Sequence, residues 1–194
     1  MIEDSAIEIF YPSTREAWRG WLQEFHLSKQ AVWVVFHKKS SDKASITWTE
    51  AVEEALCFGW IDSKKVSVDA ESSHQFFSKR KAKGTWSKIN KDKVELLIAN
   101  GQMTAAGLKA IALAKENGSW TMLDDVEKLV IPEDLIKVLK TKAGAEDFFL
   151  GLSKSVKKAM LQWIMFAKRT ETREKRILEI AELAAQGLRP TQFR

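Results

Sequence analysis

The sequence predicts an α+β protein that is predominantly α-helical, with a small N-terminal β-sheet packed with helices, followed by a C-terminal helical region. Two observations predict this arrangement. Runs with the length and composition of strands occur in about the first 85 residues, and beyond them apolar residues recur at helical period between glycine stops. We therefore expect an α+β region over residues 1–90 and a helical region over residues 91–194.

The α+β region begins with a helix and a strand. Ser13 and Glu16 have the spacing of a capping box, which predicts a helix over residues 13–25. Its apolar residues recur at helical period, at Ala17, Trp18, Trp21, Leu22 and Phe25. The run AVWVVFH at residues 31–37 is β-branched and aromatic, and it predicts a buried strand.

A second helix is predicted between Thr47 and Gly59. Thr47 and Glu50 repeat the capping-box spacing, and Gly59 stands where a helix ends, because glycine accepts the left-handed backbone there. Glu53 and Glu54 are expected on a solvated face rather than as a catalytic pair, since adjacent side chains on a helix diverge by about 100°. Short strands are predicted over residues 60–62, 65–69 and 72–80, with a turn at residues 63–64.

The helical region divides at cap residues and glycines. Asn90 is expected to cap a helix over residues 91–100, and Thr104 a helix over residues 105–117. Pro132 fits the first turn of a helix over residues 133–140, and a short helix follows over residues 143–150. Ser153 or Ser155 opens a long amphipathic segment that reaches about residue 185, with a bend or a second helix near residues 170–172.

Composition and charge favour a cytoplasmic protein with one strongly basic segment. The single cysteine excludes an intramolecular disulfide, the acidic N-terminus does not resemble a signal peptide, and no run of about 18 apolar residues suggests a transmembrane segment. The formal net charge is +5, yet residues 79–93 alone hold seven basic side chains and one acidic side chain. This short segment therefore supplies more than the whole excess of positive charge.

The stretch AVEEALCFGWIDS, residues 51–63, raises the question of an active site at the only cysteine. Cys57 falls in the last turn of the predicted helix, where the negative helix end and apolar neighbours raise the pKa of a thiol. This favours a buried structural cysteine, although a histidine brought close by the fold would favour a nucleophile. Asp62 either caps the following turn or pairs with a cation such as Arg80. A pocket of Cys57, Trp60 and Asp62 near Arg80 is the basis of an enzyme hypothesis.

No recognised catalytic or cofactor motif occurs in the sequence. There is no glycine-rich dinucleotide or phosphate loop, no zinc-protease motif and no Gly-x-Ser-x-Gly. Three scattered histidines and one cysteine do not make a metal-ligand cluster. We therefore expect no cofactor and no metal, and a binding protein in preference to an enzyme, although catalytic groups can assemble from distant positions.

Residues 76–93 form the first candidate binding feature. Seven basic residues are interleaved with the rings of Phe76, Phe77 and Trp86, a pattern that fits single-stranded nucleic acid held by cations and stacked rings. The alternative is a solvated loop whose rings face the core. The candidate anion- or ligand-binding residues lie at the centre of this segment and at a predicted helix start: Arg80, Trp86, Ser87, Lys88 and Asn90.

The C-terminal amphipathic segment is the second candidate binding feature. On a helical wheel Arg169, Arg173 and Arg176 share one side with Lys158, opposite the apolar stripe. Like charges at this spacing repel slightly, so an acidic group of the same protein or of a partner is expected to compensate them. The alternative is an ordinary solvated helix face.

Three C-terminal motifs carry a family resemblance. They are IPEDL from residue 131, WI at residues 163–164 and AKRTETREKRI from residue 167. Together they resemble the C-terminal domain of the YdeI/OmpD-associated, bacteriocin-protection (OmdA-type) family over residues 131–188. The upstream segments EAVEEALCFGWIDS, WSKIN and GQMTAAGLKAI are similar to longer members of that family.

The resemblance implies a role in resistance to bacteriocins or cationic peptides, with an envelope protein as partner and periplasmic members. It implies no catalytic residues and no particular ligand or oligomeric state. The leading hypothesis is therefore a non-enzymatic binding protein for stress tolerance of this type. The alternative is a nucleic-acid-binding protein that uses residues 76–93.

Overall fold

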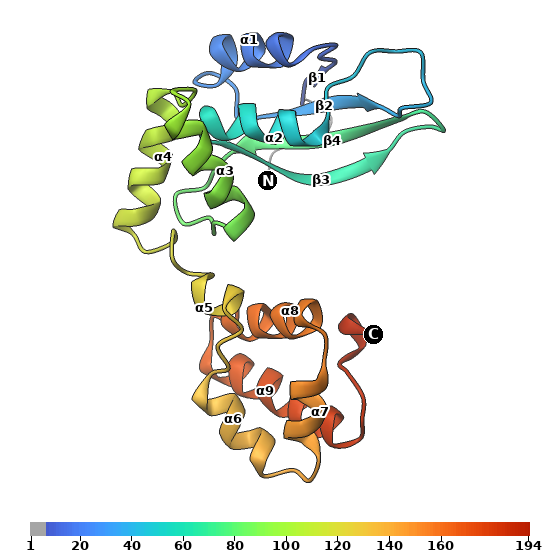
Figure 1. Ribbon diagram of the computed structural model, residues 1–194, viewed down its shortest axis with the longest axis vertical. Helices are drawn as coiled ribbons and strands as arrows, with labels where there is room; N and C mark the ends of the chain where they lie inside the picture. Colours follow the sequence, from blue (N-terminus) through green and yellow to red (C-terminus); the bar gives the residue numbers. More distant parts are fainter. Residues whose placement is uncertain (1–6) are drawn as a thin grey trace. The chain divides into compact units, whose positions relative to one another are not determined.

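The computed structural model describes residues 7–194, and the chain divides into two compact units, Met1–Thr121 and Met122–Arg194 (Figure 1). Each unit has its own hydrophobic core, and the expected α+β, mostly helical fold class is confirmed. The units divide later than the expected boundary at residue 90. The reason is that the two helices after the sheet contribute Val94, Leu97, Ile111 and Ala114 to the core of the first unit.

Within the described residues, one sheet of four strands lies at the centre of the first unit, in the order β1-β2-β4-β3. The strands are β1 (Ile9–Phe10), β2 (Ala31–His37), β3 (Trp60–Ser67) and β4 (Ser72–Lys79). β1 runs parallel to β2, and β4 runs antiparallel to both of its neighbours. The turn expected at residues 63–64 is wrong: β3 continues there with a shift of register, and the chain reverses after Val68, whose N–H donates to the carbonyl of Ser72.

Helices α1 (Arg15–Phe25) and α2 (Trp48–Cys57) cover one face of the sheet (Figure 1). The N-cap of α1 is Thr14, whose hydroxyl accepts the N–H of Ala17 at 3.2 Å, rather than the expected Ser13. The capping box expected at the start of α2 is confirmed. The core between helices and sheet is densely aromatic, with four buried rings in contact: Trp18, Trp21, Trp60 and Phe77.

Helices α3 (Lys88–Ala99) and α4 (Ala105–Glu116) complete the first unit. Thr104 caps α4 as expected, and its N–H and hydroxyl both donate to the carbonyl of Cys57, at 3.1 and 2.6 Å. Gly107 packs directly against that same carbonyl. Any Cβ at this position would clash with it, since it would lie 2.3 Å from the carbonyl oxygen. The start of α4 is therefore fixed against the C-terminal end of α2.

The second unit is helical. Its elements are α5 (Asp124–Glu127), α6 (Glu133–Lys140), α7 (Ala145–Gly151), α8 (Lys154–Met165), α9 (Thr170–Ala185) and the 3₁₀ turn η2 (Thr191–Phe193). Pro132 stands at the N-cap of α6 and Ser153 caps α8, while the break before α9 confirms the second helix expected near residue 170. Large apolar side chains from α6 to α9 fill the core, among them Leu135, Phe149, Ile164 and Ile177.

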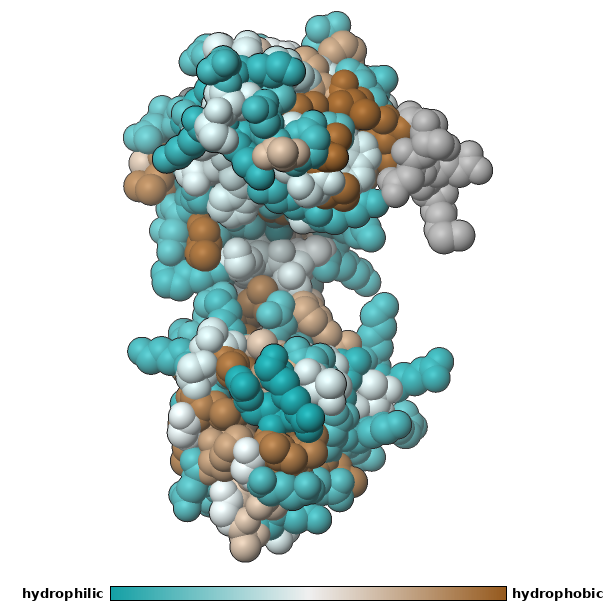
Figure 2. Space-filling view, turned by 90° about the vertical axis from the view of Figure 1, so that its right-hand side faces the viewer, coloured by the Kyte–Doolittle hydropathy of each residue, from teal (hydrophilic) through white to brown (hydrophobic). Residues whose placement is uncertain are grey.

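The surfaces of the two units are of mixed polarity. Figure 2 shows hydrophobic residues at the surface of both units, set among hydrophilic ones. No helix among residues 7–194 combines the length and the apolar character needed to cross a membrane.

Candidate functional site

Arg80, at the end of β4, is the most unusual polar residue that the structure describes. Its backbone N–H donates to the carbonyl of Gly59 at 2.9 Å, and its guanidinium lies over the ring of Trp86, 3.6 Å from the ring centre. Nη2 donates to the carbonyl of Thr85 at 2.7 Å. Nε and Nη1 are buried and have no hydrogen-bond partner among residues 7–194. Two donors of a buried cation are thus left unused.

The charge of Arg80 is strongly affected by its surroundings. Burial lowers the pKa of Arg80 from its usual value to about 10, and the negative charge of Asp62 opposes this shift only in part. A guanidinium with this pKa is still protonated at neutral pH. A buried cation with unfilled donors is costly, because water no longer solvates it. An anion that fills those donors would remove this cost.

The Arg80 pocket, about 350 Å³ in volume, opens beside this guanidinium. Its apolar walls come from the segment after α1, from the end of α2, from β3 and from α4: Leu27, Phe58, Trp60, Ala106, Ala110 and Leu113. Three lysines, Lys79, Lys81 and Lys109, also line it, and the ammonium of Lys79 donates to the carbonyl of Leu27 at 2.7 Å. The pocket therefore combines apolar walls with positive charge.

The fold of the first unit brings these walls together through two glycines. Gly59 has a φ of +73°, and a Cβ there would lie 3.1 Å from the carbonyl oxygen of Ala106 and 3.2 Å from the Cβ of Ala110. Gly107 permits the close approach of α4 to the carbonyl of Cys57. Both contacts hold α4 against the end of α2, and α4 supplies Lys109 and Leu113 to the pocket.

The remaining candidates of the basic segment lie at the start of α3. Ser87 is its N-cap, and its hydroxyl accepts the N–H of Asn90 at 3.3 Å, so Asn90 lies in the first turn rather than at the expected cap position. Lys88 pairs with Asp92 at 2.9 Å, one helical turn away. Of the five residues named from the sequence, only Arg80 and Trp86 meet at the Arg80 pocket.

Two of the three aromatic rings in residues 76–93 are buried, whereas stacking on a base requires an exposed ring. Phe77 lies in the core, and Trp86 is 2% exposed between the guanidinium of Arg80 and the ring of Trp120. Of these three rings only Phe76 is partly exposed, and it lies on the face of the sheet that α2 does not cover. Phe77 and Trp86 thus follow the alternative in which the rings of the segment face the core.

The second group of candidates, Cys57, Trp60 and Asp62, does not form one pocket. Cys57 is fully buried, and burial, followed by the charge of Glu54, raises the pKa of its thiol against the opposing effect of Arg19. Trp60 lines the Arg80 pocket. Asp62 does not line that pocket, and it accepts the ring N–H of Trp48 at 2.9 Å. It influences Arg80 through its charge and makes no hydrogen bond with it.

Sequence reasoning missed Glu54, which it placed on a solvated face. Its side chain is 2% exposed and accepts hydrogen bonds from Nε of Arg15 and Nη1 of Arg19, both at 2.6 Å. The two arginines stand four residues apart and therefore on one face of α1. That spacing was the available signal for a carboxylate on the facing helix.

The C-terminal arginines have partners inside the second unit. Arg173 holds Asp134 with two nitrogens, at 2.6 and 3.0 Å, and thereby lowers the pKa of that carboxyl group. Arg176 lies over the ring of Trp163, 4.9 Å from its centre, and donates to the carbonyl of the same residue. Arg169 is exposed at the N-cap position of α9. The expected acidic compensation is therefore internal for Arg173.

A search for metal ligands gave no cluster in the part of the chain that the structure describes. No group of three or more histidine, cysteine, aspartate or glutamate side chains among residues 7–194 is arranged to hold an ion.

The fold and the site together define a two-unit α+β protein with a basic, aromatic-lined pocket in its first unit. The chain belongs to the family described as a domain of unknown function (DUF8412), whose model matches residues 10–110, within the first unit. Residues 128–187, within the second unit, match the family described as Bacteriocin-protection, YdeI or OmpD-Associated, which confirms the resemblance of the C-terminal motifs. Comparison with curated proteins and with solved structures gave no match.

Proposed function

We propose that this protein is a non-enzymatic binding protein of the bacteriocin-protection type, and that its first unit binds a small amphipathic anion in the Arg80 pocket. The observation that carries the proposal is the buried guanidinium of Arg80, whose Nε and Nη1 have no partner among the described residues. An anionic group on the ligand would accept hydrogen bonds from these donors.

The walls of the pocket favour a ligand with an apolar part. Leu27 and Leu113 offer exposed apolar surface next to the charge, and Lys81 and Lys109 add positive charge at exposed positions. A carboxylate with a short hydrocarbon chain matches both features, because its head meets cations while its chain leaves water. The volume of about 350 Å³ lies in the range of small-molecule sites.

The proposal predicts that octanoate binds and that Arg80→Met abolishes most of this affinity. The loss should be at least about tenfold, because a hydrogen bond to a charged group contributes roughly 1.5–3 kcal/mol. Isothermal titration calorimetry with octanoate measures the effect, and octanol, which has the chain without the charge, should bind more weakly. Methionine keeps the packing of the arginine stem against Trp86 and removes only the cation.

The matched control is Lys83→Met, an exposed cation of the same loop outside the pocket, which should bind octanoate like the unaltered protein. Arg80→Met should unfold no earlier than the unaltered protein, since it removes a buried charge with unused donors. Equal binding of octanoate by the two variants, or equal binding of octanol and octanoate, would refute the proposal.

The family matches support the physiological part of the proposal. Because residues 128–187 match the bacteriocin-protection model, we propose that binding serves tolerance of bacteriocins or related envelope stress. We also propose a cytoplasmic location and, because the second unit matches the bacteriocin-protection model, an envelope protein as a partner.

One observation favours a second candidate function, the binding of single-stranded nucleic acid. It concerns the outer face of the sheet, which is the face that α2 does not cover. The rings of Trp33 and Phe76 meet edge to face at 4.9 Å, and the ammonium of Lys64 lies 5.0 and 5.4 Å from their centres. A hollow of about 760 Å³ continues from Phe76 to Lys79 and Lys81. Cations beside partly exposed rings are the pattern that holds single strands.

This candidate predicts binding of a single-stranded oligonucleotide that weakens roughly fiftyfold between about 50 and about 200 mM salt, if four cations contact phosphates. Filter binding measures it, and Phe76→Leu should reduce affinity at least about fivefold, because stacking on a base contributes roughly 1–3 kcal/mol. Absence of binding at the lower salt concentration would exclude this function.

A further inference from the structure

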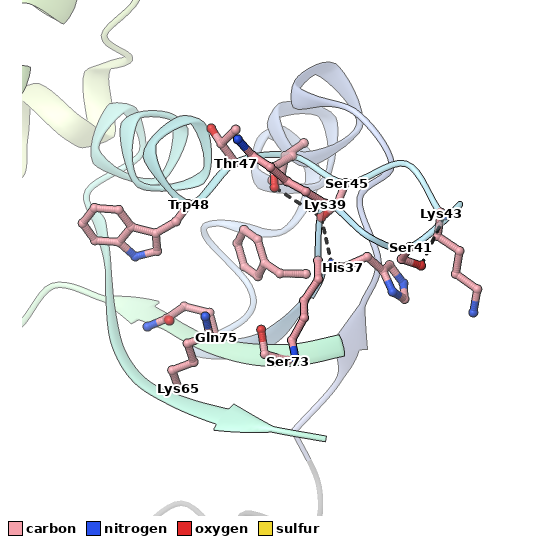
Figure 3. Close-up of a pocket in the computed structure, with 13 residues that line it drawn as sticks. His37, Lys39, Ser41, Lys43, Ser45, Thr47, Trp48, Lys65, Ser73 and Gln75 are labelled. Atoms are coloured by element: carbon pink, nitrogen blue, oxygen red, sulfur yellow. Dashed lines mark hydrogen bonds between the residues drawn. The ribbon is translucent and has the colours of Figure 1, made fainter. Parts of the chain in front are cut away.

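A second cleft, called here the loop cleft, lies at the other end of α2 from the Arg80 pocket. It has a volume of about 560 Å³ and is bounded by the loop that follows β2, by the start of α2 and by β3 and β4. Figure 3 shows Trp48, Gln75 and Lys65 along one side, and Lys39, Ser41 and Lys43 of the loop on the other, with Lys43 at its outer end. The loop cleft shares no lining residue with the Arg80 pocket.

The charge of the loop cleft is wholly positive. Four exposed lysines line it, namely Lys38, Lys39, Lys43 and Lys65, and no acidic side chain does. Within residues 7–194 none of the four has a carboxylate partner within 4.0 Å. These lysines therefore present uncompensated charge to whatever enters the cleft.

Two carboxylates beside the cleft are engaged with its walls. Glu50 accepts hydrogen bonds from the N–H and the hydroxyl of Thr47, at 2.8 and 2.7 Å, which lowers the pKa of its carboxyl group. Asp62 accepts from the ring of Trp48 at 2.9 Å and from the side chain of Gln75 at 3.2 Å. Both acids stabilise the walls of the cleft. Glu71 accepts the hydroxyl of Ser41 at 3.3 Å, and Asp42 stands on the loop without lining the cleft.

The walls also offer a planar apolar surface. Trp48 is 48% exposed, a high value for a tryptophan, and its ring is held in place by the hydrogen bond to Asp62. Phe36 and Ile46 form a buried apolar floor, and Gln75 is the buried polar residue beside them. A ring fixed by a hydrogen bond loses little conformational entropy when a second ring stacks on it.

We propose that the loop cleft binds a small molecule that carries both a phosphate group and a planar ring, of the mononucleotide class. Lysine ammonium groups bind phosphate as point charges, and the ring of Trp48 provides a stacking surface for the base. The size of the cleft matches sites for molecules of this size. The first unit would then hold two ligand sites, one at each end of α2.

The test is isothermal titration calorimetry with adenosine diphosphate, adenosine and inorganic pyrophosphate on the full chain. Adenosine diphosphate should bind more tightly than adenosine, which lacks the phosphates, and more tightly than pyrophosphate, which lacks the ring. The double variant Lys39→Met and Lys65→Met should weaken its binding at least about tenfold, because two ammonium–phosphate contacts are lost. Trp48→Leu should weaken the binding of adenosine diphosphate about fivefold or more and leave the binding of pyrophosphate unchanged.

Two control variants separate this site from others. Lys83→Met removes an exposed lysine outside the cleft, and Arg80→Met alters the other pocket, so both should bind adenosine diphosphate normally. The proposal is overturned if adenosine diphosphate does not bind at low salt, or if the lysine variant binds it unchanged. If pyrophosphate and adenosine diphosphate bind with equal affinity and Trp48→Leu changes neither affinity, the stacking role of the tryptophan is overturned.

Discussion

Gly107→Ala is expected to lower the free energy of unfolding of the first unit by about 3 kcal/mol, the upper end of what an added methyl group costs in a packed core. The new Cβ would lie 2.3 Å from the carbonyl oxygen of Cys57 and 2.8 Å from its carbon. The carbonyl has little freedom to move, because it accepts the N–H and the hydroxyl of Thr104. The start of α4 must therefore shift away from α2.

The measurement is urea unfolding followed by circular dichroism, with Gly20→Ala as the control. Gly20 lies within α1, and apart from the neighbouring backbone of that helix no atom lies within 4 Å of where its Cβ would be, so alanine there should stabilise the unit by about 0.5–1 kcal/mol. Because α4 also carries Lys109 and Leu113, Gly107→Ala should weaken octanoate binding as well. A Gly107→Ala variant as stable as the Gly20→Ala variant would contradict the close helix contact.

Glu54→Gln is expected to lower the free energy of unfolding by about 2–3 kcal/mol, because a buried carboxylate that takes two charged hydrogen bonds is lost. The amide has one acceptor oxygen for two guanidinium groups, and its NH₂ group would face a cation. The loss is smaller than for a fully buried triad, since the side chains of Arg15 and Arg19 are 29% and 30% exposed and water can solvate them.

The neighbouring residue supplies the matched control. Glu53 contacts Arg15 at 3.3 Å and Lys93 at 2.8 Å, but its side chain is 23% exposed. Glu53→Gln should therefore cost less than about 1 kcal/mol, as is usual for ion pairs that reach solvent. Urea unfolding of the two variants side by side measures the difference, and equal losses would show that burial of Glu54 contributes nothing.

Local signals in the sequence predicted most helix starts, and the errors have a common cause. Thr104 was placed correctly, because it stands alone before an apolar periodic run, whereas Ser153 and Ser155 were both open as the start of α8, and the structure has Ser153 as its N-cap. Asn90 was chosen in place of Ser87, three residues earlier, since both are good N-cap residues. For the same reason Ser13 was predicted as the N-cap of α1, whereas the structure has its neighbour Thr14 there. Only the tertiary position of the helix decides between two adjacent cap candidates.

The candidate site could be predicted in part. The basic and aromatic composition of residues 76–93 singled out Arg80 and Trp86 together, and they do form one contact. What the sequence could not give is the burial of that guanidinium, which depends on α4 being held close by Gly59 and Gly107. For the same reason the burial of Glu54 was missed, because it depends on α1 lying across α2.

The crowding of aromatic rings in the first core has an optical consequence. Seven of the eight tryptophans lie in the first unit, and Trp18, Trp21 and Trp60 are within 5.3–5.7 Å of a neighbouring indole. Indoles at such separations exchange excitation energy, so their emission changes as a group when that core opens. In the second unit Trp163 is the sole indole, beneath the guanidinium of Arg176. Intrinsic emission thus reports on the first unit almost alone, and a Trp163→Phe chain would make it a reporter of that unit exclusively.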